Sequence, residues 1–118
     1  MLKPIVWIGG TRKDMSSLPA TVRRTFGFAL HLAQGGSRHE ASKPLRGFGG
    51  AGVLEVVEDV KGGTYRAVYT VRFKVAVFVL HVFQKKSTSG IAMPRPDLEL
   101  IRARLQQAAK IAEEMKDE

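Results

Sequence analysis

The sequence predicts an α+β fold in which a small, antiparallel-rich β-sheet is packed by helices. Two observations predict it. Three strand-like runs follow one another closely between residues 53 and 83, and a helical pattern with an apolar face stands on each side of them. With a short strand at the start, the expected order is β-α-β-β-β-α. The 118 residues contain no fixed-period repeat and no linker, so residues 1–118 are expected to form a single domain.

The first part of the chain predicts a strand and then a helix. Residues 3–9 are rich in β-branched and aromatic side chains, which favours a strand. A helix is expected to follow, with Ser16 or Ser17 as its cap, Pro19 in its first turn and Gly35 just after its end. The apolar face of this helix consists of Val22, Phe26, Ala29, Leu30 and Ala33.

A loop and three strands are expected next. The segment from residue 35 to residue 52 is rich in glycine and cations and predicts a loop, and the strands cover residues 53–59, 64–73 and 75–83. Strands joined so closely are expected to be antiparallel neighbours. In the middle strand, residues of even number from Arg66 to Arg72 share one face. The last strand is apolar on both faces, which indicates a central strand covered on both sides.

A long helix is expected to close the chain, from Pro96 to about Met115. Its apolar residues recur at intervals of three and four, as in a helix that packs along one seam. These residues are Leu98, Ile101, Leu105, Ala108, Ala112 and Met115.

The charge of the chain points to a polyanionic partner. The net charge is +8, and residues 1–95 hold 15 basic and 5 acidic side chains, whereas residues 96–118 hold 4 basic and 6 acidic ones. The basic excess therefore belongs to the body of the protein and not to the last helix. A body with this charge favours nucleic acid as a partner.

Several kinds of site are disfavoured by the sequence. There is no cysteine, and His31, His39 and His81 lie in three different expected elements, so neither a metal site nor a cofactor is expected. The glycine-rich segment before residue 53 lacks a phosphate-loop lysine and precedes a strand instead of a helix. No serine stands in a nucleophile elbow. No apolar run approaches the ~20 residues of a membrane span, so a cytoplasmic protein is expected.

The remaining candidates for chemistry are cations on strands and at strand ends. They are Arg66 and Arg72 on one strand face, Lys85 and Lys86 at the end of the most apolar strand, and Lys43 and Arg46 in the preceding loop. A sheet face with this charge suits an RNA phosphate backbone, with aromatic side chains nearby as stacking surface. The acidic residues closest in sequence, which could neutralise these cations, are Glu55, Glu58 and Asp59.

A family resemblance rests on a combination of motifs in the second half of the chain. The stretches "LRGFGGAGVLEVVED" and "YRAVYTVRFKVAVFVLHVFQKKS" are followed by "PRPDLELIRARL". Together, the LRG loop, the Y-R-x-x-Y strand and the apolar strand that ends in L-H-x-F-x-K-K resemble the RelE/ParE toxin superfamily of type II toxin–antitoxin modules. The similarity is greatest to its phage-derived Gp49-like, HigB-type branch, and it implies a RelE-like fold.

The resemblance implies a metal-independent endoribonuclease that cuts mRNA on the ribosome by attack of the substrate's own 2′-hydroxyl. It implies that Arg66 contacts phosphate, and that Lys85 or Lys86 stabilises the charge of the transition state or protonates the leaving oxygen. His81 is expected to be either a proton carrier or a buried structural residue. Relatives carry lysines, one of them a suspected general base, in the strand that here holds Glu55. The base is therefore a carboxylate or His81, or the reaction relies on positioning alone.

The resemblance also implies partners. A cognate antitoxin, often of helix-turn-helix type, would neutralise the toxin, and mRNA on the ribosome would be the substrate. Two alternatives remain at this stage. One is a ParE-like inhibitor of DNA gyrase without enzymatic activity, and the other is a basic nucleic-acid-binding module without toxicity.

Overall fold

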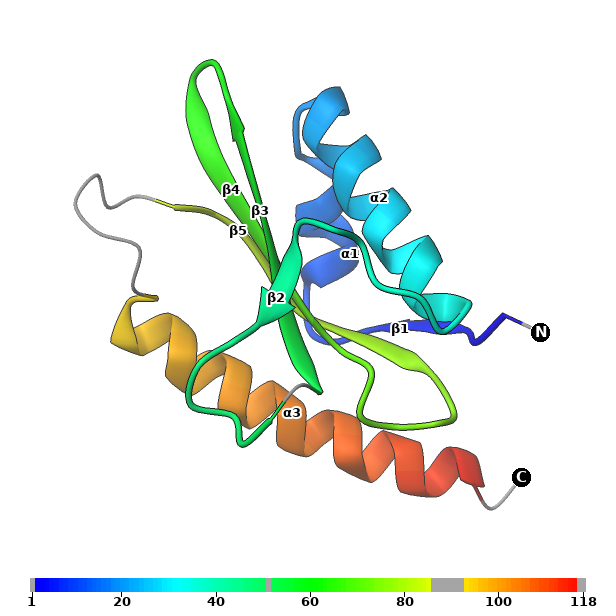
Figure 1. Ribbon diagram of the computed structural model, residues 1–118. Helices are drawn as coiled ribbons and strands as arrows, with labels where there is room; N and C mark the ends of the chain where they lie inside the picture. The colour runs from blue at the N-terminus through cyan, green and yellow to red at the C-terminus, as the bar shows by residue number, and fades with distance from the viewer. Residues whose placement is uncertain (1, 51, 86–92, 117–118) are drawn as a thin grey trace.

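The structure, a computed structural model, describes residues 2–50, 52–85 and 93–116. The strands are β1 (Ile5–Trp7), β2 (Ser42–Pro44), β3 (Val53–Val60), β4 (Gly63–Thr70) and β5 (Val77–Lys85). The helices are α1 (Thr11–Ser16), α2 (Ala20–Gln34) and α3 (Arg95–Lys116). The strands form one mixed sheet in the order β1-β5-β4-β3-β2, and helices lie on both of its faces (Figure 1). The predicted α+β class is confirmed.

The sheet is antiparallel except at one edge. The pairs β2–β3, β3–β4 and β4–β5 are antiparallel, whereas β1 pairs with β5 in parallel. A parallel pair needs a long crossover connection, and the chain between β1 and β5 supplies it with two helices and three strands. Because β5 lies between β1 and β4 and is covered on both faces, seven of the eight residues from Val77 to Gln84 are buried or half-buried. The prediction of a central strand is confirmed.

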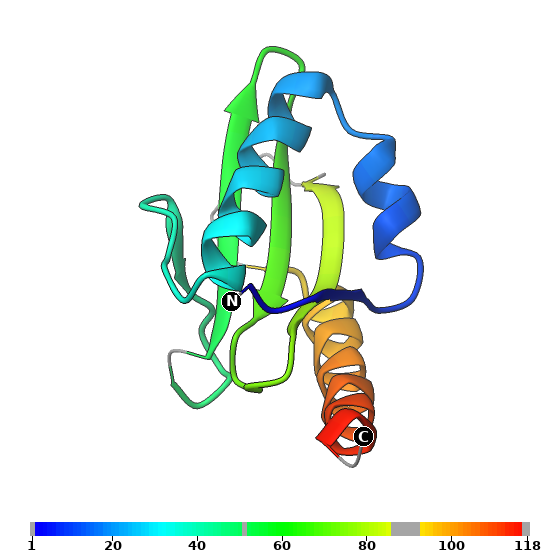
Figure 2. The ribbon, with the colours of Figure 1, turned by 90° about the vertical axis from the view of Figure 1, so that its right-hand side faces the viewer.

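Two apolar cores separate the sheet from its helices. On one face, α1 and α2 pack side by side over the sheet (Figure 2), and the five predicted apolar residues of α2 are all buried there. On the other face, α3 crosses the sheet and buries Ile101, Ala108 and Ala112 against Val68 and Phe78. The predicted seams of both long helices are therefore confirmed.

Two short elements were not predicted. The helix α1 occupies residues that were expected to connect the first strand to the first helix. Strand β2 lies in the segment that was expected to be a loop, and three residues are too few to show a period in sequence. Pairing with β3 makes β2 the edge of the sheet, so Lys43 stands on a strand and not in a loop.

The strand boundaries also differ from the prediction. β4 ends at Thr70, three residues early, and β5 begins and ends two residues later than expected. Residues 71–76 leave the sheet between them instead of making a reversal at Lys74 alone. As a result, Lys85 is the last residue of β5 and does not follow it.

Candidate functional site

A row of paired residues crosses four strands on the face of the sheet that α3 covers, and three of its four members have ionisable side chains. The register pairs Lys43 of β2 with Glu55 of β3, Glu55 with Val68 of β4, and Val68 with His81 of β5. Directly opposed residues in antiparallel strands project to the same face with their Cβ atoms about 5 Å apart. The pairing therefore places Lys43, Glu55 and His81 along one line, with the apolar Val68 between the last two.

The next rows, toward the β3–β4 hairpin, hold two of the predicted site residues. Arg66 of β4 is paired with Phe83 of β5, and Lys85 is paired with Thr64. Since Arg66, Phe83 and Lys85 occupy matching positions on adjacent strands, all three belong to the α3 face of the sheet. Within β4 and β5, Arg66 and Lys85 are the arginine and lysine residues on this face.

A β-bulge decides which residues of β5 reach this face. The pairing passes from Tyr69–Val79 to Val68–His81, which leaves Leu80 as an extra residue on β5. The extra residue reverses the alternation, so His81 and the residues two and four positions later face α3. The carbonyl oxygen of Leu80 accepts a hydrogen bond of 2.9 Å from Nη1 of Arg104 on α3.

Arg66 and Glu55 form a buried charged pair. Nη1 of Arg66 lies 3.6 Å from Oε2 of Glu55, and their side chains are only 4% and 9% exposed. Nη1 of Arg66 also lies 4.0 Å from Sδ of Met93, which precedes the start of α3 at Arg95. A charge taken out of water needs a counter-charge close by, and Glu55 supplies it for the guanidinium. The prediction that an acidic residue of this strand could neutralise the cations is thus realised by Glu55.

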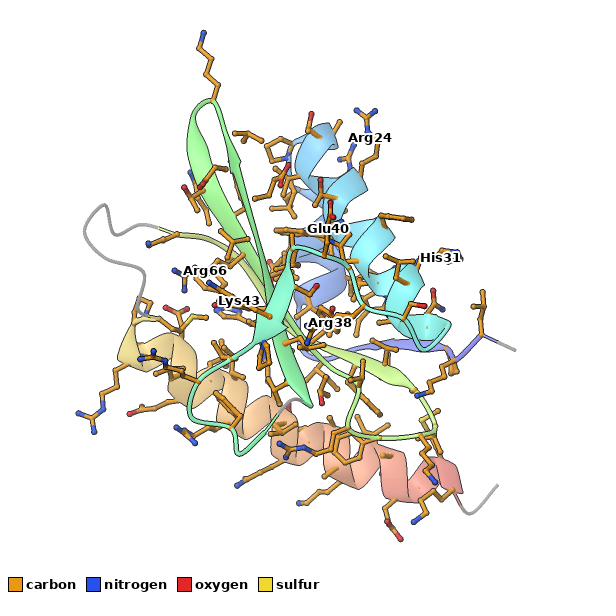
Figure 3. The ribbon with its side chains drawn as sticks, viewed as in Figure 1. Arg24, His31, Arg38, Glu40, Lys43 and Arg66 are labelled. Carbon is orange, nitrogen blue, oxygen red and sulfur yellow. The ribbon has the colours of Figure 1, made fainter. Side chains whose placement is uncertain are left out.

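A pocket of about 500 Å³, which we call the basic groove, opens over this pair. Its lining residues are Lys43, Pro44, Leu45, Arg46, Glu55, Arg66, Met93 and Leu98. The exposed Lys43 and Arg46 stand on one wall, and the first turn of α3 provides the other. Figure 3 shows Lys43 and Arg66 next to each other, while Arg24 and His31 point away on α2. The groove therefore unites Lys43, Arg46 and Arg66, three of the predicted site residues.

His81 is a buried residue that anchors α3. Its Nε2 lies 2.7 Å from Oδ1 of Asp97 in the first turn of α3, and the side chain is 11% exposed. Its ring stacks on the ring of Phe83, with centroids 4.2 Å apart and planes 15° apart. Of the two roles considered for His81, these contacts support the structural one, because the nitrogen nearest to a carboxylate is already engaged.

Lys85 and Lys86 were alternatives for the cation at the strand end. Lys85 is half-buried and, by its pairing with Thr64, belongs to the face that carries Arg66. Lys86 lies outside the described residues. The register thus gives Lys85 a definite place beside Arg66.

The predicted partnership of Arg66 and Arg72 is wrong. β4 ends at Thr70, so Arg72 has left the strand, and its Nη2 donates a 2.7 Å hydrogen bond to the carbonyl oxygen of Phe48. It lines a different pocket, of about 490 Å³, against the C-terminal half of α3. Arg72 does not line the basic groove.

A hydrogen bond inside the core fixes the edge strand that carries Lys43. The hydroxyl group of Tyr69 on β4 donates to Oγ of Ser42 on β2 over 2.8 Å, and both residues are buried. Burial raises the pKa of Tyr69 above its ordinary value of 10.0, although the Ser42 hydrogen bond and the charge of Arg38 act in the opposite direction. The hydrogen bond between Tyr69 and Ser42, on the opposite face of the sheet, therefore helps to hold Lys43 in position.

The described residues contain neither a metal-binding cluster nor a membrane-spanning helix. Within residues 2–50, 52–85 and 93–116, no group of three or more His, Asp or Glu side chains is arranged to hold a metal ion. None of the helices in the described part of the chain is long and apolar enough to cross a bilayer.

Comparison with protein families decides the relationship of the chain. The family described as phage derived protein Gp49-like matches residues 13–106. The chain belongs to this Gp49-like family. The match extends from α1 to the middle of α3 and includes every residue that lines the basic groove. A search of curated protein sequences gave no match.

The fold of this Gp49-like protein is that of RelE. The chain is similar to the structure of the free E. coli toxin RelE, determined as a double arginine-to-alanine mutant. The TM-score is 0.57 and the identity is 23%, over 91% of this chain and 98% of the RelE chain. The expected Gp49-like relationship and the expected RelE-like fold are confirmed.

Sequence reasoning missed several contributors to the site of this Gp49-like protein. Met93, just before α3, and Leu98, near its start, line the groove, and Asp97 contacts His81. An acidic residue in the first helical turn was visible in the sequence, but its partner, 16 residues earlier, was not. Phe83 was not singled out among the aromatic residues expected near the cations, because the bulge that turns it to the site face leaves no sequence signal.

Proposed function

We propose that this protein is the toxin of a type II toxin–antitoxin module and acts as an mRNA endoribonuclease on the ribosome. The observation that supports the proposal is the basic groove, in which Lys43 and Arg46 stand at the surface and Arg66 lies at the base beside a carboxylate. Membership in the Gp49-like family and the RelE fold are consistent with this role.

The reaction asks little covalent chemistry of the protein. The 2′-oxygen of the RNA forms a bond to the adjacent phosphorus, and the bond from phosphorus to the 5′-oxygen breaks. A base accepts the 2′-hydroxyl proton, the leaving 5′-oxygen takes up a proton, and the products are a 2′,3′-cyclic phosphate and a 5′-hydroxyl. The protein must hold the RNA in line, exchange protons and stabilise the negative charge on phosphorus.

The residues of the groove have distinct roles in this proposal. Arg66 contacts the reacting phosphate, and Lys85 stabilises the charge that develops on the leaving oxygen. Glu55 accepts the proton, because it is the carboxylate in the groove, whereas Glu58 and Asp59 contact Thr25 and Thr64 elsewhere. Glu55 thus replaces the basic residues that relatives carry in this strand.

Lys43 and Arg46 bind the flanking RNA backbone, since both are exposed on the wall of the groove. His81 positions the first turn of α3 and touches no substrate in this scheme. Lys86 lies outside the described residues and shares with Lys85 the role proposed for a cation after the last strand.

The proposal is tested by induction in bacteria and by cleavage of mRNA on purified ribosomes. Wild type is expected to arrest growth and to cut transcripts within codons. The double variant Lys43→Ala/Arg46→Ala is expected to cleave about tenfold more slowly or worse, since it lacks two phosphate contacts. Arg66→Lys keeps the charge but loses the planar guanidinium, and is expected to lose on the order of 100-fold in rate. Arg66→Lys is preferable to Arg66→Ala, which would leave Glu55 buried without its counter-charge.

The matched control is Arg12→Ala/Arg24→Ala, which removes two exposed cations from α1 and α2, on the other face of the sheet. It is expected to cleave like wild type. If both double variants lose the same fraction of the cleavage rate, the groove is not the RNA-binding surface. The loss then reflects only the overall charge of the protein. Intact mRNA together with gyrase-trapped DNA breaks would instead establish a ParE-like gyrase inhibitor. RNA binding with normal growth would establish a nucleic-acid-binding module without toxicity.

The proposed partner is a cognate antitoxin, of helix-turn-helix type, that presents acidic or apolar side chains to this surface. Lys43 and Arg46 are the exposed cations of the groove that it would cover. Co-expression with the product of the neighbouring reading frame is expected to restore growth and to yield a stable complex. Rescue of growth without a complex would count against direct neutralisation.

A further inference from the structure

Phe83 is an aromatic side chain that serves neither core. It is half-buried on the α3 face of the sheet. Among the described residues it packs against neither of the two apolar clusters, although Phe78, five positions earlier on the same strand, is fully buried in one of them. A phenylalanine in a strand normally contributes its area to a core. Its place on the site face therefore needs another explanation.

The ring of Phe83 is held from behind. One side of it stacks on the imidazole ring of His81, at 4.2 Å between centroids and nearly parallel. Nε2 of His81 lies 2.7 Å from Oδ1 of Asp97, which fixes the imidazole ring. Both His81 and Phe83 belong to the central strand β5. Phe83 and His81 thus form a rigid aromatic pair. A further planar group can stack on this pair without further loss of its side-chain conformational entropy.

The cations of the site stand next to this pair. Arg66 is the residue directly opposite Phe83 on β4, and Lys85 follows two residues later on the same face of β5. Opposed residues lie about 5 Å apart at Cβ, and residues two apart in a strand lie about 7 Å apart. A phosphate held by Arg66 and Lys85 would bring the base of the same or the next nucleotide within reach of Phe83.

We propose that Phe83 is the stacking platform for one nucleobase of the RNA bound at the site. The proposal rests on the RNA-cleaving function proposed above and names a residue that would fix the substrate in that site. Stacking tolerates any base because every base has a π-face, so Phe83 positions the RNA without reading its sequence. Holding the base limits rotation about the reacting ribose, which favours the in-line geometry of 2′-hydroxyl attack.

The test uses ribosomes programmed with mRNA that carries 2-aminopurine in the A-site codon and a 2′-deoxy sugar at the scissile position. The deoxy sugar removes the nucleophile, so binding is observed without cleavage. Wild type is expected to quench the 2-aminopurine fluorescence. Phe83→Leu is expected to lose the quench and to bind about tenfold more weakly. Phe83→Trp is expected to restore both, because its ring also stacks. The same RNA without ribosomes provides a second substrate.

Phe28→Leu is the matched control. The substitution is chemically the same, and Phe28 is 54% exposed on α2. Its ring contacts His39, and neither residue lines the groove. It is expected to behave like wild type. The proposal is overturned if Phe83→Leu keeps the quench and the affinity, if Phe28→Leu has the same effect, or if wild type quenches with neither substrate.

Failure of this proposal can be told from failure of the proposed function. If wild type and Phe83→Leu cut unmodified mRNA at equal rates, the stacking platform fails and the ribonuclease stands. If wild type quenches the fluorescence but cuts no unmodified mRNA, Phe83 is a stacking residue in a protein that is not a ribonuclease. Urea unfolding of Phe83→Leu is expected to match wild type within about twofold in the folding equilibrium constant, since Phe83 lies outside both cores.

Discussion

Arg66 and Glu55 are charged residues at positions that β-sheets usually give to apolar ones. Each is buried and each has the other as its counter-charge, at 3.6 Å. Such a pair adds little stability over apolar residues of the same size, but removing one partner leaves a buried charge and costs about 3–5 kcal/mol. Stability alone therefore does not account for the pair, whereas the role proposed for Arg66 and Glu55 in RNA cleavage would account for it.

The variant Asp97→Ala tests whether the contact between Asp97 and His81 anchors α3. Asp97→Ala removes the partner 2.7 Å from Nε2 and leaves the buried His81 without it. We expect the free energy of unfolding to fall by about 1–3 kcal/mol. Hydrogen exchange should also accelerate in the first turn of α3. Urea unfolding and exchange mass spectrometry measure the two effects.

Glu99→Ala is the control for Asp97→Ala. It lies in the same turn of α3 but is 69% exposed and pairs with Arg95, which is 89% exposed, so its loss should cost no more than about 0.5 kcal/mol. Equal destabilisation by both variants would show that only the charge at the helix start matters, and that His81 does not hold α3.

At the scale of elements, β2 is the strand whose position matters most for the site. It has three residues and pairs with β3 alone, yet it places Lys43 on the wall of the groove. A strand this short at an edge has few backbone hydrogen bonds of its own. The bond from Tyr69 to Ser42 therefore contributes a large share of what keeps β2 in register.

Tyr69→Phe tests the burial of the Tyr69 hydroxyl group through the dependence of stability on pH. Because burial raises the pKa of Tyr69, the folded state holds the phenol proton more tightly than the unfolded state, whose pKa is near 10.0. The resulting stability is present below pH 10 and is lost as the pH rises through the higher pKa of the folded state. Urea unfolding should show wild type losing stability above pH 10 more steeply than Tyr69→Phe.

At pH 8, the free energy of unfolding of Tyr69→Phe is expected to be about 1 kcal/mol lower than that of wild type. This is the net contribution of one buried hydrogen bond. Tyr65→Phe serves as the control, since it is the same substitution at a half-buried tyrosine of the same strand. If Tyr69→Phe and wild type lose stability in parallel above pH 10, the tyrosine does not ionise on unfolding as argued.

At the scale of the whole molecule, three distant segments meet at the end of β1. Gly9 links β1 to α1 with a φ of +59°, and Arg104 of α3 lies against it. The same arginine donates to the carbonyl oxygen of Leu80 at the bulge of β5. Gly9 is therefore the point at which the parallel edge of the sheet, the bulge and the last helix are held together.

Gly9→Ala is expected to strain this junction. A Cβ there would lie 2.7 Å from Nη2 of Arg104, and the left-handed backbone costs a residue with a side chain about 1–2 kcal/mol. Urea unfolding should show that the free energy of unfolding falls by at least that amount. The adjacent Gly10→Ala is the control, because Gly10 has a φ of −88° and the nearest atom to its Cβ would be 4.0 Å away. Similar losses for the two glycines would contradict the close approach of Arg104.

The sequence by itself determined the α+β class, the two long helices with their buried faces and the three central strands. These follow from short-range periodicity, which a window of ten residues contains in full. It also determined that Arg66 belongs to a strand, and that Lys43, Arg46 and Lys85 are candidate partners, because charge and motif are local properties.

Only the tertiary structure decided which of these cations share a site. The extra residue Leu80 in β5 turned Phe83 and Lys85 to the face of Arg66, and the early end of β4 took Arg72 away from it. The pairing of β2 with β3 brought Lys43 opposite Glu55. Registers, bulges and strand ends depend on contacts between segments far apart in the chain, so no local pattern could contain them.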